Sequence, residues 1–221
     1  MKNLPIRLFV GYFEWSPIHY HAFVQSVLQH ATHPVAITPL KLNHLKGFFT
    51  RERTPDQLTD FSYSRFLVPY LCNYEGWAIF MDGADMMLRE DISKLWALRD
   101  EAYDVMLVKH ADIQGEHQFQ GKTISSYKMF NWSSLMLFNN AKCTKLTLDY
   151  VNNADYHELH QFKWLAHVDR IGDLPATWNH LVGYHPPRED VALVHWTQGV
   201  PSMKAPSGLA FEEEWRTLLL L

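Results

Sequence analysis

Cysteine is scarce in this sequence, because Cys72 and Cys143 are its only two in 221 residues. They form neither a CxxC pair nor a zinc-like spacing, and we expect two buried thiols in a protein of a reducing compartment. An excess of basic charge is also lacking: 20 Lys and Arg face 24 Asp and Glu, which gives a formal charge of −4. The sequence therefore offers no global positive field that would hold nucleic acid.

Long apolar runs are lacking as well. The run within residues 1–10 and the one at Leu218–Leu221 are too short for a signal peptide or a membrane span. We therefore expect a cytoplasmic protein without a transmembrane segment. The P-loop, GxGxxG and GxSxG patterns do not occur. Kinase, Rossmann dehydrogenase and serine hydrolase functions thus have no motif to support them.

Hydrophobic residues, by contrast, make up 47% of the chain and aromatic residues 14%, which is enough for a packed core. An apolar run at Ile6–Val10 ends at Gly11 and predicts a buried strand. Ser16 as N-cap and Pro17 suit the start of a helix, and Val35–Thr38 predicts a second strand. This strand–helix–strand opening is typical of nucleotide-binding α/β folds.

The rest of the chain continues the alternation of strands and helices. The polar stretches 41–60 and 110–128 are expected as loops. No repeat, low-complexity tract or linker divides the chain, so the sequence predicts one α/β domain over residues 1–221. Further buried strands are expected at Trp77–Met81, Met86–Leu88, Val105–Val108, Ser134–Phe138 and Val191–Val194, with helices at Phe61–Leu71 and through Leu95 and Leu98.

The most informative segment is WAIFMDGADMML, residues 77–88, in which a buried strand runs directly into Asp82 and Asp85. The carboxyl edge of an open α/β sheet is where such folds bind ligands. Two carboxylates three residues apart, with a tight bend at Gly83, can converge on one hard cation that bridges diphosphate oxygens. The same residues also fit a plain turn in which Asp82 accepts hydrogen bonds from backbone amides.

A second segment, VALVHWTQGVP at residues 191–201, places His195 where another apolar strand ends. An imidazole nitrogen suits Mn²⁺ or another transition metal better than it suits Mg²⁺ or Ca²⁺. Gly199 permits a close approach of the backbone to a donor diphosphate. Since the chain has thirteen histidines, a histidine at a strand end also occurs by chance.

Six segments follow one another in an order that extends this pattern: a strand ending in Gly11-Tyr12, FSYSRFLVPYL, FMDGADMMLREDISKLW, FNWSSLMLFN, LPATWNHLVGY and VHWTQGVP. From about Ile6 to Pro201 the chain resembles bacterial glycosyltransferases of the family-8 type, related to glycogenin and the lipopolysaccharide galactosyl- and glucosyltransferases. The resemblance implies a GT-A fold, a Rossmann-like domain with a mixed central sheet. It also implies a nucleotide-sugar donor, usually a UDP-sugar, and Mn²⁺ or another divalent cation as cofactor. The acceptor stays open among lipopolysaccharide or another lipid-linked glycan, a free glycan, a protein and a small molecule.

The resemblance implies roles for individual residues. Asp82 and Asp85 match the two aspartates of the DxD metal motif, with one extra residue between them, and His195 matches the late metal ligand. Gln161 matches the glutamine near the transferred sugar and is the candidate catalytic residue. The residues expected to contact the donor are Gly11, Tyr12, Arg65, Asp82, Asn131, Ser133, Ser134 and Gly199.

The chain also departs from this family. Relatives commonly carry Asp and then Glu after the GY pair, whereas this chain has Phe13-Glu14-Trp15-Ser16, and the lysine expected near Lys204 is out of register. Two functions therefore stay open. One is metal-dependent sugar transfer with retention, by a front-face or a covalent route, and the other is binding of nucleotide or glycan without turnover. A nucleotidyltransferase ranks below both, because the glycine-rich basic loop that would clamp a triphosphate is lacking.

Overall fold

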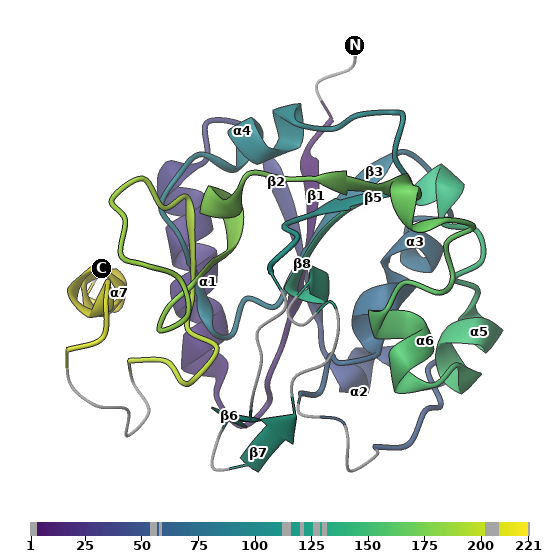
Figure 1. The fold of residues 1–221 in the computed structure, drawn as a ribbon, viewed down its shortest axis with the longest axis horizontal. Coiled ribbons are helices and arrows are strands. Elements are labelled where there is room, and N and C mark those ends of the chain that lie inside the picture. Colours follow the sequence, from purple (N-terminus) through teal and green to yellow (C-terminus); the bar gives the residue numbers. More distant parts are fainter. Residues whose placement is uncertain are drawn as a thin grey trace.

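The computed structural model describes residues 4–53, 57, 59–111, 116–119, 122–125, 129, 132–201 and 208–220, with the backbone alone at 116–119 and 122–125. Its centre is a six-stranded sheet in the order β2-β1-β3-β8-β5-β9, with helices on both sides (Figure 1). β8 runs antiparallel to both β3 and β5, whereas the other neighbouring pairs are parallel, so the sheet is mixed, as predicted. The strands are β1 (Ile6–Gly11), β2 (Val35–Leu40), β3 (Trp77–Met81), β5 (Val105–Leu107), β8 (Leu135–Asn139) and β9 (Ile171–Asp173).

A smaller, three-stranded sheet joins β10 (His180–Leu181), β11 (Leu193–His195) and β4 (Met86–Leu88) in that order. The short strands β9 and β10 are not visible in the sequence, because three and two residues are too few to show an alternation. The hairpin of β6 (Glu116–Phe119) and β7 (Lys122–Ser125) corrects the expected loop over 110–128. Its sequences, EHQF and KTIS, carry little apolar alternation that would signal a strand.

The sequence did not predict the helices α2 (Leu42–Leu45), α5 (Leu148–Asn153), α6 (Tyr156–His160) and α7 (Glu212–Leu218). α2 lies inside the stretch 41–60 that was expected as a loop, and Leu45, only 5% exposed, anchors it in the core. Among the described residues, no helix is both long and apolar enough to cross a membrane. The helices are α1 (Pro17–His30), α2 (Leu42–Leu45), α3 (Val68–Leu71), α4 (Ile92–Ala97), α5 (Leu148–Asn153), α6 (Tyr156–His160) and α7 (Glu212–Leu218), with the 3-10 turns η1 (Ser64–Leu67), η2 (Trp132–Ser134), η3 (Asn140–Lys142), η4 (Val168–Arg170) and η5 (Ala176–Asn179).

Two helix starts follow from local chemistry. Pro17 begins α1 as predicted, but the Ser16 hydroxyl lies 2.9 Å from Nδ1 of His19 and does not cap a backbone amide. The expected helix over residues 61–71 is instead split into η1 and α3. Pro69, near the start of α3, has no amide hydrogen with which to continue the preceding turn.

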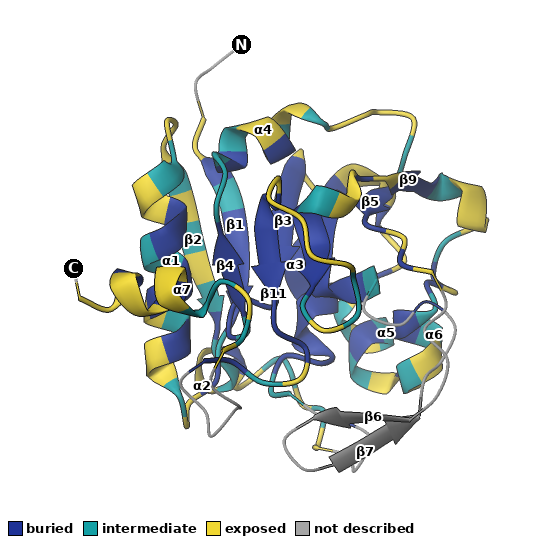
Figure 2. Ribbon diagram, turned by 60° about the vertical axis from the view of Figure 1, so that its left-hand side comes forward, coloured by how far each residue is buried: buried dark blue, intermediate teal, exposed yellow. Residues whose placement is uncertain are grey.

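Side chains that alternate along the strands divide the core into two layers. On β1, Leu8 and Val10 face the layer covered by α1 and α4, whereas Phe9 faces the layer covered by α3, α5 and α6. The wholly apolar β3 is buried on both faces, and Figure 2 shows it in dark blue beside β1. Both cysteines are free and buried, as expected. The strand interiors are apolar, so polar side chains such as that of Asp82 lie where the strands end.

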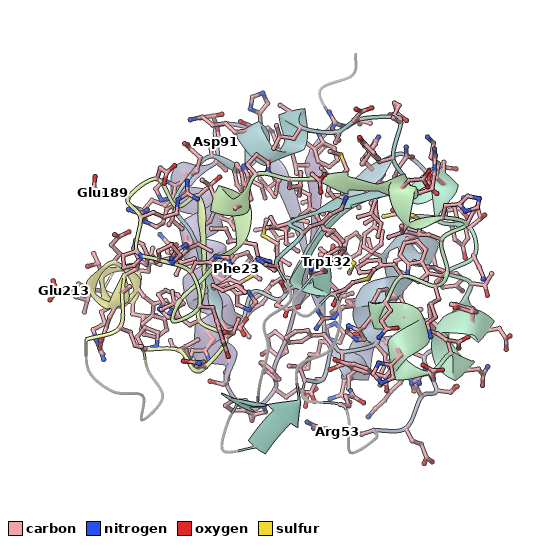
Figure 3. All side chains as sticks on the ribbon, in the orientation of Figure 1. Phe23, Arg53, Asp91, Trp132, Glu189 and Glu213 are labelled. Carbon is pink, nitrogen blue, oxygen red and sulfur yellow. The ribbon has the colours of Figure 1, made fainter. Side chains whose placement is uncertain are left out.

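The last helix, α7, packs back toward the strand that carries His195. Trp215 of α7 is 1% exposed and lies in one apolar cluster with Val194 and Trp196. The Trp196 indole nitrogen donates to the carbonyl of Ala210 at 3.0 Å. Glu213, on the outer face of α7, lies at the rim of the molecule in Figure 3. α7 therefore covers the small sheet from outside.

Candidate metal centre

Asp82 directly follows the central strand β3 and therefore lies at the carboxyl edge of the sheet. The Asp82 amide donates to the carbonyl of Ser134 at 2.9 Å, which fixes the backbone beside the neighbouring strand β8. Gly83 then adopts φ +71°, and a Cβ there would lie 2.3 Å from Cγ1 of Val10. Only glycine fits this bend, which turns the chain toward Asp85 and β4.

The small sheet brings the distant histidine to the same place. β4 pairs antiparallel with β11, with Met86 opposite His195, and the Trp196 amide donates to the carbonyl of Asp85 at 2.8 Å. One ligand atom each from Asp82, Asp85 and His195 lies within 4.8 Å of the others. Nε2 of His195 is 3.3 Å from Oδ2 of Asp85. The two segments singled out in the sequence therefore form one cluster.

This cluster has the chemistry of a metal site. Oδ1 of Asp85 is buried and has no hydrogen-bond donor among the described residues, whereas Oδ1 of Asp82 faces the guanidinium of Arg65. Buried polar atoms normally have a partner, so the Asp85 oxygen fits a missing positive ligand. Carboxylates combined with an imidazole nitrogen suit Mn²⁺ and related transition metals. The residues present thus fit a divalent cation.

Arg65 lies against the same carboxylates. Its Nη1 is 2.8 Å from Oδ1 of Asp82, without the alignment of a hydrogen bond, and the side chain is 6% exposed. Nε donates to the carbonyl of Phe61 at 3.1 Å and Nη1 to that of Ser133 at 2.9 Å. Arg65 is thus held beside Asp82 by the protein itself. Its expected contact with the donor stays a prediction.

The pKa of Asp82 yields a test of this geometry. Burial raises the pKa of Asp82 to about 7; Arg65 and His195 oppose the rise and Asp85 adds to it. Between the ordinary value of 3.8 and about 7, the folded state then binds more protons than the unfolded state. Stability must therefore fall as the pH rises through this window. We expect the protein in EDTA to melt at a lower temperature at pH 8 than at pH 5, as measured by circular dichroism.

The matched control for this pH effect is Asp82→Asn, which has no carboxyl to titrate at this position. Its melting temperature should depend less on pH over the same range than that of the parent. Equal pH dependence in the two proteins would contradict the raised pKa of Asp82.

Several residues that were expected to contact the donor serve the protein's own packing. A Cβ on Gly11 would lie 2.6 Å from the Phe61 ring and 2.7 Å from the Asp82 carbonyl, so this position has no room for a side chain. The Ser133 hydroxyl lies 2.8 Å from Nδ1 of His160, and the Ser134 hydroxyl accepts from Asn179 at 2.8 Å. These contacts fix the segments that surround the metal cluster. The expected contacts of Gly11, Ser133 and Ser134 with the donor stay predictions.

Three other expected site residues lie apart from these contacts. Tyr12 packs edge-on against the Tyr20 ring at 5.1 Å. Gln161 follows α6, with its side-chain nitrogen 3.5 Å from Nδ1 of His157, and its catalytic role stays a prediction. Gly199 has φ +130° and open space where a Cβ would stand. Asn131 lies outside the described residues.

The segment that departs from the family pattern has a structural role of its own. Phe13 is 4% exposed and packs on Phe61, with 4.9 Å between ring centroids. The Glu14 carboxylate accepts from Asn43 at 2.6 Å and lies 3.8 Å from Nζ of Lys41. Trp15 is 54% exposed. The phenylalanine thus belongs to the core, and the glutamate is bound to Lys41 and to Asn43 at the start of α2.

Sequence reasoning missed Asn179, which is fully buried behind His195. Its Oδ1 is 2.9 Å from Nδ1 of the imidazole. The only signal was a polar residue next to a short strand in LPATWNHL, and the sequence does not show that this segment lies behind VALVHW.

Solved structures with the same fold are glycosyltransferases. The chain matches the bifunctional glycosyltransferase WbbM with a TM-score of 0.62 and 12% identity, over 97% of this chain and 49% of that one. It matches the glycosyltransferase GlyE of Streptococcus pneumoniae TIGR4 with a TM-score of 0.63 and 13% identity, over 99% and 61%. For the galactosyltransferase LgtC in complex with donor and acceptor sugar analogs, the values are 0.63 and 10%, over 96% and 95%. The chain thus spans about half of WbbM and under two thirds of GlyE, and it has the GT-A fold.

No family model matches the sequence. Protein CDI of Arabidopsis thaliana is 35% identical over 224 residues, which cover 97% of this chain and 86% of the relative. The chain belongs to the family of Protein CDI.

Proposed function

We propose that this protein is a metal-dependent glycosyltransferase that moves a sugar from a nucleotide-diphosphate sugar, a UDP-sugar by expectation, to an acceptor with retention. One observation carries the proposal: Asp82, Asp85 and His195 converge within 4.8 Å at the carboxyl end of β3. That edge is where α/β sheets bind their ligands. The GT-A fold and the order of the sequence motifs support the same class, and with them the family-8 relationship.

The residues divide the work in this proposal. Asp82, Asp85 and His195 hold a divalent cation, which supplies positive charge to the diphosphate of the leaving nucleotide. Arg65 balances the charge of Asp82 and keeps its carboxylate turned toward the cluster. Gly199, with open space where a Cβ would stand, leaves room for the diphosphate. The acceptor stays open among a glycan, a lipid-linked glycan, a protein and a small molecule.

A second function is a protein that binds nucleotide or glycan without turnover. The observation that favours it is the core position of Phe13 together with the engagement of Glu14 by Asn43 and Lys41. These contacts occupy the stretch in which relatives of the family-8 type carry Asp and Glu. A base contact made by those two groups is therefore lost or replaced here.

Hydrolysis of nucleotide-sugars separates the two functions, because transferases slowly pass sugar to water. The purified protein is incubated with UDP-glucose, UDP-galactose or a GDP- or ADP-sugar, in Mn²⁺, Mg²⁺ or EDTA, and the released nucleotide is measured. We expect release from a UDP-sugar in Mn²⁺ and none in EDTA. Thermal shift with the same compounds reports binding in parallel.

The outcomes are distinct. Stabilisation by UDP and Mn²⁺ without release of nucleotide, with or without added glycans, favours the binding function. Stabilisation by none of the nucleotides in any metal contradicts the transferase, and stabilisation by none of the glycans either contradicts both functions. Equal stabilisation by UDP in Mn²⁺ and in EDTA contradicts the metal dependence.

A further inference from the structure

A buried amide connects the candidate metal ligands behind the site. Asn179, the last residue of η5, is 0% exposed. Its Oδ1 lies 2.9 Å from Nδ1 of His195, and its Nδ2 donates to the Ser134 hydroxyl at 2.8 Å. The carbonyl of Ser134 accepts from the Asp82 amide at 2.9 Å. One residue at the start of β8 therefore supports both Asp82 and, through Asn179, His195.

These contacts decide where the imidazole carries its proton. An amide oxygen can only accept a hydrogen bond, so Oδ1 of Asn179 requires a proton on Nδ1 of His195. A neutral imidazole has one ring proton, and its Nε2 is then a bare acceptor. This acceptor lies 3.3 Å from Oδ2 of Asp85, which is also an acceptor. Two acceptors at that distance repel each other unless a proton or a metal cation lies between them.

We propose that Asn179 is a positioning residue that holds His195 in the Nδ1–H tautomer and directs the Nε2 lone pair at a divalent cation. Metal-binding histidines generally donate their other ring N–H to an acceptor, which fixes the tautomer and the ring orientation. The inference rests on the proposed metal-dependent function. It adds that Asn179, anchored by Ser134, acts on the metal through His195 and not by a contact with the substrate.

The first measurement is Mn²⁺ affinity, obtained from the electron paramagnetic resonance signal of free Mn²⁺ during titration. Removing the partner behind a metal-binding histidine weakens metal binding by about 10–100-fold. We expect a loss of that size for Asn179→Ala. The matched control is Asn139→Ala, because Asn139 is also buried and its amide donates to Glu101 at 2.9 Å at the other end of β8. It should bind Mn²⁺ as the parent does.

The second measurement uses the unsubstituted protein, so it does not depend on whether a variant folds. Nitrogen-15 spectra of the histidine rings report the tautomer, and the signals of His195 are assigned by their loss in His195→Gln. At about pH 8.5, where imidazoles are ordinarily neutral, we expect the proton of His195 on Nδ1. A proton on Nε2 overturns the inference, because the Asn179 amide would then face His195 with its nitrogen.

The two measurements separate this inference from the function on which it rests. If the parent does not bind Mn²⁺ in the titration, the proposed function fails, and with it the purpose of the tautomer. If the parent binds Mn²⁺ and Asn179→Ala binds it equally well while folded, only the positioning role of Asn179 fails.

Discussion

Replacing Asp85 with asparagine is expected to abolish the stabilisation that UDP and Mn²⁺ together give to the parent protein. Asp85 contributes a buried carboxylate oxygen without a donor, and its other oxygen lies 3.3 Å from Nε2 of His195. Asparagine keeps the size of the side chain and removes its charge. The cation then loses a charged ligand, and the diphosphate loses the cation.

The size of this effect follows from mass action. With ligand at 100 times its dissociation constant, the parent gains about 2.7 kcal/mol, which is a shift of roughly 5–10 °C in melting temperature for a chain of this length. Removing a residue that only hydrogen-bonds a metal ligand weakens metal binding by up to roughly 100-fold. Removing the ligand itself should weaken binding at least as much. The gain then falls to about 0.4 kcal/mol, or about 1 °C. Differential scanning fluorimetry measures both shifts.

Two further variants make the comparison specific. Asp173→Asn neutralises an exposed carboxylate, 73% accessible and paired with Lys109, and should keep the full shift. Asp82→Asn should lose less than Asp85→Asn, because Asp82 already shares its charge with Arg65 and has a pKa raised to about 7 by burial. A full UDP–Mn²⁺ shift in Asp85→Asn would remove this residue from the site.

The fold was predictable where a strand is wholly apolar and followed by a bend. Residues 77–81 form β3 with the bounds that the sequence predicts, because a strand buried on both faces needs an unbroken apolar run. Where pairing rests on two or three residues, as in β10, no pattern remains. The position of β8 was predicted to within one residue. Its antiparallel direction depends on how the whole sheet is connected, and the spacing of apolar residues does not show this.

The sequence predicted the candidate metal ligands, but it did not predict the residues that hold these ligands in place. Asp82 lies directly after β3, Asp85 directly before β4 and His195 at the end of β11, and the resemblance joined them into one expected group. Asn179 and Ser134, by contrast, act through hydrogen bonds between η5 and η2, two segments about 45 residues apart in the chain. Their side chains are common ones, and only the folded arrangement shows that they lie behind the imidazole.

Replacing Arg65 with methionine is expected to cost the metal-free protein about 3–5 kcal/mol, because one partner of a buried ion pair is removed while the other stays. The guanidinium is 2.8 Å from Oδ1 of Asp82 and also donates to the carbonyls of Phe61 and Ser133. Methionine fills similar space and makes none of these contacts. The expected fall in melting temperature is roughly 6–20 °C, measured in EDTA by thermal unfolding.

The pH dependence identifies the cause of that loss. Without Arg65, which lowers the pKa of Asp82, the carboxyl should protonate more readily, so Arg65→Met should lose more stability at pH 8 than at pH 6. Adding Asp82→Asn to Arg65→Met should return part of the stability, since no buried charge is then left unpaired. The surface control Arg188→Met removes an exposed partner of Asp190 and should leave the melting temperature nearly unchanged. If Arg65→Met melts within about 1 °C of the parent at pH 8, the Asp82 carboxylate does not depend on Arg65. The arginine is then free to contact the donor, as the family resemblance implied.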